Sequence, residues 1–121
     1  YYGDAGESFQ LPPYRSIVTK LLKDTEETMW KVIHQLRGGM PLNQVGLIIE
    51  QEANRRGYQI VRNLCSHGIV LTIEPFFATK SSYVRDAGDG WTLELENGGF
   101  VAQFEHTVVV TDGEPHIMTL P

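Results

Sequence analysis

Cysteine is almost absent from this sequence, since Cys65 is the only one among 121 residues. An internal disulfide is therefore excluded, which favours a reducing compartment, and we expect the cytoplasm. The sequence also has no apolar run long enough to span a bilayer and no signal-peptide pattern, so we expect no membrane partner. Basic runs are missing beyond Arg55-Arg56, and the formal net charge is −5. This charge balance argues against a nucleic-acid partner.

An initiator methionine is also missing, because the chain opens with Tyr1-Tyr2-Gly3-Asp4. We therefore expect the biological polypeptide to be longer. The residues present suffice for one domain, since a chain of 121 residues with 41% hydrophobic and 21% charged side chains can bury a substantial core. No repeat or low-complexity segment divides it.

Two helices are predicted in the first half of the chain. The first opens at Pro12-Pro13 and ends at Gly38-Gly39. Its apolar positions follow the spacing of one buried helix face: Tyr14, Ile17, Val18, Leu21, Leu22, Met29, Val32, Ile33 and Leu36. The second begins near Pro41 with Asn43 as its N-cap, buries Val45, Ile48, Ile49 and Ala53, and ends before Gly57.

The rest of the chain predicts an antiparallel sheet. Residues 1–10 resemble the end of a hairpin, with a turn or bulge at residues 3–6, and residues 78–90 resemble a loop. Strands are expected at 58–64, 70–74, 91–96, 100–110 and 116–119, with turns at Asn97-Gly98-Gly99 and Asp112-Gly113 making a meander. Helices early in the chain and an antiparallel sheet later indicate the α+β class.

The predicted strand from Val101 to Val110 carries an unusual carboxylate. Alternate side chains of a strand share a face, and one face here is mostly apolar: Ala102, Phe104, His106, Val108 and Val110. The other face places Glu105 between Gln103 and Thr107. Because the segment is too apolar for a solvent edge, we expect Glu105 to be half-buried and to need an ion pair, a hydrogen bond or a metal.

Three more polar residues stand where apolar or turn residues are expected: Asp4, His67 and Glu74. Each has an ordinary explanation, as a turn former, a hydrogen-bonded histidine or a paired acid, and no pair has a diagnostic spacing such as CxxC or HExxH. Together with Glu105 they make three carboxylates and one imidazole, a donor set suited to Mn²⁺, Fe²⁺, Co²⁺ or Zn²⁺. Carboxylates can bridge two such ions, which lower the pKa of a bridging water. The residues alone indicate a candidate carboxylate-rich metal site.

Five short motifs then occur in a familiar order: Gly3-Asp4, Arg62 with Cys65-Ser66-His67-Gly68-Ile69, Thr72-Ile73-Glu74-Pro75, Gly90-Trp91-Thr92, and Ala102-Gln103-Phe104-Glu105-His106-Thr107. Together they resemble the catalytic domain of type I methionine aminopeptidases of bacterial character, from Tyr1 to about Leu120. The resemblance implies one metallopeptidase domain over residues 1–121 with the pita-bread fold, an α+β fold in which helices cover an antiparallel sheet. It also implies a hydrolase that uses two divalent metal ions, Co, Mn, Fe or Zn, to remove the initiator methionine from new polypeptides.

The resemblance assigns metal ligands residue by residue. Asp4 matches the bridging second aspartate, and Glu105 matches the bridging glutamate. His67 matches the histidine ligand, and Glu74 matches the first glutamate ligand. Because carboxylates that hold metal-bound water often accept its proton, Glu74 is the expected base, with His67 as the second catalytic residue.

Substrate contacts are implied at three further positions. Trp91 matches an aromatic residue that lines the methionine pocket. Gln103 resembles a residue of the same cleft. Cys65 matches a cysteine beside the ligand histidine, where it has no ligand role.

The sequence departs from the family pattern in three places. The first aspartate ligand of the family lies upstream of the position of Tyr1. A segment with a second histidine is missing between Ile69 and Val70, and Ser66 stands where glycine is usual. We expect the parent polypeptide to hold the missing residues and the 121 residues taken alone to be inactive.

Other readings remain open. A proline-specific dipeptidase of the same fold is disfavoured by Phe76-Phe77 after Glu74-Pro75 and by His106 after Glu105. A non-catalytic pita-bread binding module would tend to lose its metal ligands, and an unrelated acidic α+β interaction domain would make the five motifs a coincidence. For the methionine enzyme we expect a monomer whose partners are new polypeptide N-termini bearing Met, with the ribosome as a further candidate.

Overall fold

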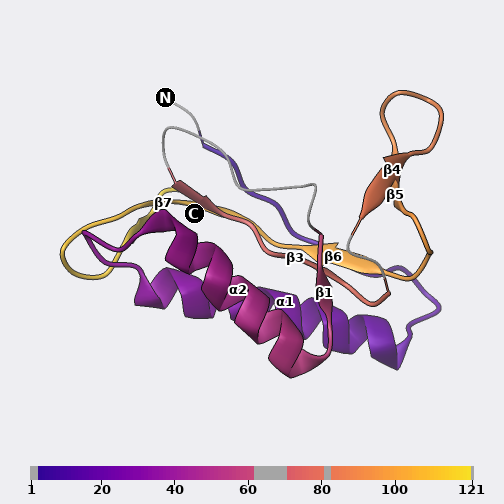
Figure 1. Ribbon diagram of the computed structural model, residues 1–121, viewed down its shortest axis with the longest axis horizontal. Helices are drawn as coiled ribbons and strands as arrows, with labels where there is room; N and C mark the ends of the chain where they lie inside the picture. The colour runs from indigo at the N-terminus through magenta and orange to yellow at the C-terminus, as the bar shows by residue number, and fades with distance from the viewer. Residues whose placement is uncertain (1–2, 62–70, 81–82, 121) are drawn as a thin grey trace.

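Two helices cover one face of a layer of strands (Figure 1). The structure is a computed structural model that describes residues 3–61, 71–80 and 83–120. Helix α1 spans Ser16–Gln35 and helix α2 spans Leu42–Arg56. Gly39 and Gly57 both adopt a φ of 85°, a left-handed conformation that favours glycine. Gly57 therefore ends α2, as the sequence predicts, whereas α1 already ends at Gln35, before the predicted stop at Gly38-Gly39.

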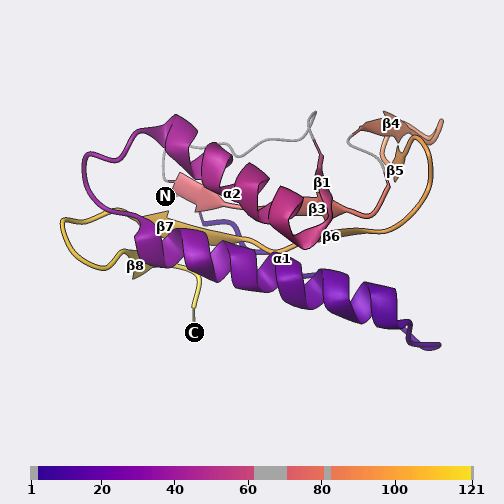
Figure 2. The ribbon, with the colours of Figure 1, turned by 60° about the horizontal axis from the view of Figure 1, so that its bottom comes forward.

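The start of α1 and the N-cap of α2 differ from the prediction, whereas α2 begins next to Pro41 as expected. The backbone stays extended through Arg15, with φ −120° and ψ 133°, so α1 begins after the two prolines rather than on them. Tyr14, which precedes α1, and Ile17, in its first turn, are consequently 70% and 52% exposed. The N-terminal end of α1 extends well beyond α2 (Figure 2). The predicted N-cap Asn43 is also wrong, since Pro41 holds that position and Asn43 lies inside the first turn of α2.

Among the described residues, eight short strands follow the helices. Their bounds are β1 Gln59–Ile60, β2 Leu71–Ile73, β3 Phe76–Ala78, β4 Val84–Asp86, β5 Leu93–Leu95, β6 Val101–Gln103, β7 His106–Val109 and β8 His116–Ile117. All pairings are antiparallel, in the orders β1-β3-β6, β2-β7-β8 and β4-β5. The β4–β5 hairpin projects from the rest of the molecule (Figure 1).

Several strand predictions are corrected. Strand β3 was not predicted, because a proline at position 75 indicates the end of a strand. The chain nevertheless forms strand pairs again from Phe76. The predicted loop 78–90 contains β4, which is too short to show an alternating pattern. The predicted meander is wrong at one step, since β5 pairs with β4 and β6 pairs with β3. Residues 3–5 form no turn, and Gly6 makes a β-bridge instead. The β7–β8 hairpin is confirmed.

The core lies between the helices and one face of the sheet. Its two main clusters combine helical and strand residues: Met29, Val32, Ile33, Leu36, Val45, Ile73, Phe104 and Val108 in one, and Leu21, Ala53, Tyr58, Phe77 and Ala102 in the other. These strand residues occupy the apolar face that alternation predicts. The opposite face, which carries Gln103, Glu105 and Thr107, is therefore the one that the helices leave uncovered.

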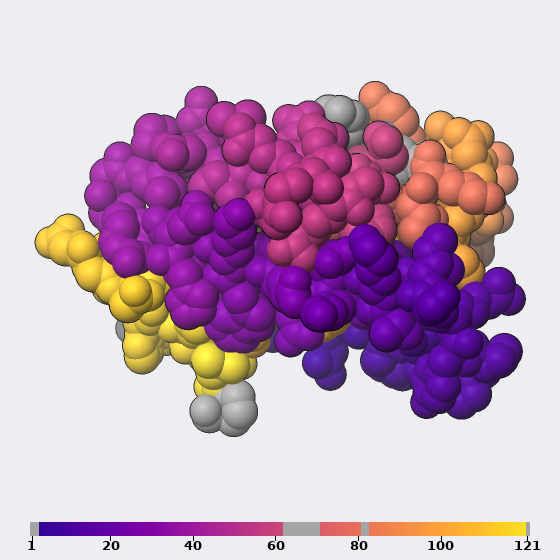
Figure 3. All heavy atoms as spheres, turned by 90° about the horizontal axis from the view of Figure 1, so that it is seen from below, coloured from indigo at the N-terminus to yellow at the C-terminus, as the bar shows by residue number. Residues whose placement is uncertain are grey.

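Seen from below, the outer surface is built mainly by the side chains of α1 and α2, with the C-terminal hairpin in yellow at one end (Figure 3). In the described part of the chain, neither helix is apolar and long enough to cross a membrane.

Candidate metal centre

The sheet places Glu74 opposite Glu105. Strands β6 and β7 make one long strand that is interrupted only at residues 104–105. The neighbouring strands β2 and β3 likewise follow each other directly and are interrupted only at residues 74–75. Since β2 pairs with β7 and β3 pairs with β6 in one continuous register, the two glutamates stand across from each other at the interruption. Directly opposed antiparallel residues share a face, so both carboxylates belong to the face away from the helices.

The N-terminal segment lies along the other edge of the same long strand. Gly6 N–H donates to the carbonyl of Glu105 at 3.2 Å, and Glu105 N–H donates back at 2.8 Å. Two residues before Gly6, the backbone N–H of Asp4 donates to the Thr107 hydroxyl at 2.7 Å. The Thr107 hydroxyl in turn donates to the carbonyl of Asp4, also at 2.7 Å. Asp4 is thereby held beside Glu105, although about a hundred residues separate them in sequence.

The environment of Glu74 includes the charges of two other carboxylates, Glu105 and Asp4. Glu74 is only 8% exposed. Burial, then hydrogen bonding and charge from Glu105, then the charge of Asp4, raise the pKa of Glu74 to about 7. Like-charged carboxylates disfavour each other's ionised forms, and a bound cation relieves that repulsion.

Glu105 is the most deeply buried of the three carboxylates, with 6% of its surface exposed. Its Oε2 accepts a hydrogen bond from Gln103 Nε2 at 3.1 Å. Its Oε1 is buried and has no hydrogen-bond partner among the described residues. A buried carboxylate oxygen without a partner is costly, and coordination of a cation would satisfy it. The donor set therefore fits a hard or borderline divalent ion.

The described residues supply only part of the predicted ligand set. His67 and Cys65 lie outside the described residues, so their roles stay predictions. Within residues 3–61, 71–80 and 83–120, no three Asp, Glu, His or Cys side chains are arranged to hold an ion by themselves. Trp91 lies between β4 and β5 and is 90% exposed, and its role in a methionine pocket also stays a prediction.

Two residues at the centre were not assigned a role from the sequence. Thr107 shares the Glu105 face by alternation, and that spacing is the signal that could have marked it. Gly6 carried no such signal, because its position opposite Glu105 depends on pairing between distant segments.

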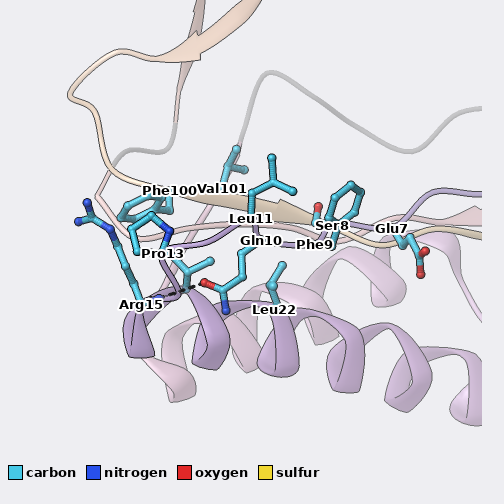
Figure 4. Close-up of a pocket in the computed structure, with 11 residues that line it drawn as sticks. Glu7, Ser8, Phe9, Gln10, Leu11, Pro13, Arg15, Leu22, Phe100 and Val101 are labelled. Carbon is cyan, nitrogen blue, oxygen red and sulfur yellow. Dashed lines mark hydrogen bonds between the residues drawn. The ribbon is translucent and has the colours of Figure 1, made fainter.

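A groove of about 550 Å³ lies between the N-terminal segment, α1 and β6 (Figure 4). Its lining is mostly apolar: Glu7, Ser8, Phe9, Gln10, Leu11, Pro13, Arg15, Val18, Leu22, Phe100 and Val101. The Arg15 guanidinium lies 5.7 Å from the centre of the Phe100 ring. None of the three carboxylates lines this groove, so it is separate from the candidate metal centre.

The chain is similar in sequence to bacterial methionine aminopeptidases. The chain is 32% identical to methionine aminopeptidase 2 of Bacillus subtilis, over 146 aligned residues that cover 98% of this chain and 59% of that protein. It is 26% identical to the methionine aminopeptidase of Escherichia coli, with 99% of this chain and 55% of that protein covered. The chain thus spans less than two thirds of these relatives. The alignments are also longer than the chain, so the relatives carry residues within the matched stretch that this chain lacks.

Two solved structures share the fold. Methionine aminopeptidase from Rickettsia prowazekii superposes with a TM-score of 0.91 and 26% identity, covering 98% of this chain and 59% of that one. The enzyme from Thermotoga maritima gives a TM-score of 0.94 at 24% identity, with 99% and 59% covered, and this likeness concerns the fold.

The fold is thus the pita-bread fold, present here in part, with an acidic pair at the centre of its sheet. The family model described as "Metallopeptidase family M24" matches residues 1–112. The chain belongs to metallopeptidase family M24.

Proposed function

We propose that the parent protein of this chain is a methionine aminopeptidase that removes the initiator methionine from new polypeptides in the cytoplasm. The observation that carries the proposal is the buried pair Glu74 and Glu105, in register across two strands and close enough to Asp4 for its charge to act on Glu74. The similarity to methionine aminopeptidases over nearly the whole chain supports the same function.

The proposed ligands are Asp4, His67, Glu74 and Glu105, with one more aspartate from the parent polypeptide. Two divalent ions bound there would supply Lewis acidity, which polarises the scissile carbonyl and acidifies a water molecule. Carboxylates from three separate segments would suit this role, because their oxygens are ligands that hard or borderline divalent ions prefer.

Glu74 is the proposed proton acceptor from the attacking water. A carboxylate that holds metal-bound water is placed to accept its proton, which is the role proposed for Glu74. The amide of Gln103 holds Glu105 in place through its 3.1 Å hydrogen bond. His67 would be the second catalytic residue, and Trp91 and Cys65 would lie near the methionine side chain, where sulfur–aromatic contact adds modest binding energy.

The test is metal-dependent release of methionine from a Met-Ala-Ser peptide by the full-length parent. Glu105→Ala removes a ligand and should lower the rate by more than about 100-fold, since even changes outside the ligand set cost 10–100-fold. Glu96→Ala, at an exposed glutamate beyond β5, is the matched control and should leave the rate unchanged.

Equal rates for the parent and Glu105→Ala would overturn the proposal. Hydrolysis of dipeptides ending in proline, with no release of methionine, would instead identify the proline-specific dipeptidase of the same fold.

A further inference from the structure

One edge of the long β6–β7 strand pairs first with the N-terminal segment, at Glu105, and then with the C-terminal segment, from Thr107 onward. The carbonyl of Thr107 accepts the N–H of Met118 at 2.9 Å, and its own N–H donates to the Thr119 hydroxyl at 3.2 Å. The backbone of Thr107 is therefore used by the C-terminal segment. Asp4 of the N-terminal segment lies on the same edge. Its backbone is bound by the side chain of Thr107 and not by the backbone of Thr107.

The Thr107 hydroxyl makes two bonds with one residue. Its Oγ1 accepts from the Asp4 N–H and donates to the Asp4 carbonyl, both at 2.7 Å. A hydroxyl has a single donor hydrogen, so this pair of bonds uses its full donating capacity. Thr107 is 1% exposed, so water has little access to compete for the hydroxyl. The Asp4 backbone is thus fixed against the strand that carries Glu105.

A second hydroxyl repeats this arrangement on the other side of Gly6. The Ser8 hydroxyl donates to the carbonyl of Gln103 and accepts the N–H of Gln103, both at 2.9 Å. The single backbone bridge between Gly6 and Glu105 therefore lies between two hydroxyl clamps, by which we mean the Thr107–Asp4 and Ser8–Gln103 pairs of bonds. One clamp holds a proposed ligand, and the other holds the residue whose amide binds Glu105.

We propose that the hydroxyls of Thr107 and Ser8 are positioning residues of the metal centre. They set the separation between the Asp4 and Glu105 carboxylates, neither of which lies in a regular strand. This inference rests on the proposed metal centre. A site assembled from three segments binds a cation tightly only when its donors are held in place before the ion arrives.

The experiment compares Thr107→Val with Thr107→Ser in the full-length parent. Valine keeps the shape and loses the hydroxyl, whereas serine keeps the hydroxyl and loses the methyl group. Co²⁺ affinity is measured by calorimetry on the metal-free protein, and the visible absorption of bound Co²⁺ reports the ligand geometry. We expect about tenfold or greater weakening and an altered spectrum for valine, and affinity within about threefold of the wild type for serine. Thermal melting of the metal-free proteins measures the purely structural effect of each change.

The outcomes separate this inference from the proposed function. If Glu105→Gln binds Co²⁺ as well as the wild type does, the metal centre itself is wrong and the inference falls with it. If Glu105→Gln loses the ion but Thr107→Val binds it normally, only the positioning role is overturned. Equal weakening in the valine and serine variants also overturns it, because the hydroxyl would then not be the cause. Ser8→Ala, at a less buried position, should weaken binding in the same direction, and it decides the question if Thr107→Val does not fold.

Discussion

At Gly6 the absence of a side chain leaves room for the amide of Gln103. A Cβ added at Gly6 would lie 2.7 Å from Gln103 Oε1 and 3.3 Å from Gln103 Nε2. The same Nε2 is the donor to Glu105 Oε2. The small size of one residue therefore keeps a hydrogen bond on a carboxylate that belongs to a different segment.

We expect Gly6→Ala to weaken the site and leave the fold intact. The Gln103 side chain is flexible at its end, so it can move aside at little cost, but it then loses its bond to Glu105. A hydrogen bond to a charged group contributes about 1.5–3 kcal/mol, so methionine release should fall by roughly tenfold or more. The melting temperature of the metal-free protein should change by no more than a few degrees.

The matched control for this prediction is Gly46→Ala. Gly46 lies in α2, and a Cβ there would meet nothing within 4 Å. Alanine is the better helix former by about 0.5–1 kcal/mol, so the control should be slightly more stable and equally active. Full activity in Gly6→Ala would contradict the account of Gln103.

At the scale of elements, an ionic network joins α1 to α2. Glu52 of α2, 5% exposed, binds Lys31 of α1 and also Arg55 and Arg56 of its own helix. Arg56 reaches back to Asp24 of α1 at 2.8 Å. Buried charges of this kind are costly when a partner is removed, so the network fixes how the two helices pack as long as its carboxylates stay ionised.

The network predicts acid sensitivity. The hydrogen bond from Arg55 first, then those from Lys31 and Arg56, outweigh burial and lower the pKa of Glu52 from 4.5 to about 2. A lowered pKa in the folded state adds stability that is fully present above the ordinary pKa and is lost as pH falls from about 4.5 towards 2. The loss should approach about 3 kcal/mol.

Urea unfolding at pH 6 and pH 3 measures this loss. The wild type should lose more stability between the two values than Glu52→Gln, which has no proton to take up at that position. Glu26→Gln, at an exposed position of α1, should follow the wild type. An identical pH dependence in Glu52→Gln and the wild type would show that the network does not act in this way.

At the scale of the whole molecule, the hydrophobic core and the proposed metal ligands lie on opposite faces of the strand layer. Its helix-covered face holds the two core clusters, and its other face holds the carboxylates. We therefore expect a divalent ion to stabilise the parent protein, because the ion binds the folded state and relieves the repulsion between Glu74 and Glu105. At a free concentration about 100 times its Kd, the gain is about 2.7 kcal/mol.

We expect Glu105→Gln to melt above the wild type when no metal is bound and below it when metal is bound. Without metal, the variant removes one of two facing carboxylates and should melt at a higher temperature than the wild type. With saturating Mn²⁺, it should gain little and melt at the lower temperature. Thermal melting of both proteins with and without a chelator measures the difference. The same order of melting temperatures in both conditions would count against a shared cation.

Much of the chain could be predicted from local pattern. The helical spacing of Leu21, Met29 and Val32 predicted α1, and Gly57 predicted the end of α2. Both signals are local, because helix propensity and hydrophobic periodicity act within a few residues. The burial of Glu105 was also predictable, from its apolar neighbours. The pairing of β5 with β4 was not, because strands of three residues carry too little pattern to choose a partner.

The sequence by itself determined which residues must be buried and which carboxylate would need compensation, since alternation and hydrophobicity are local properties. Only the tertiary structure decided that Glu74 lies across from Glu105 and that the Thr107 hydroxyl holds Asp4. Those relations depend on strand register and on a change of neighbour at one strand edge. Both arise from contacts between segments far apart in sequence, whose geometry no local pattern encodes.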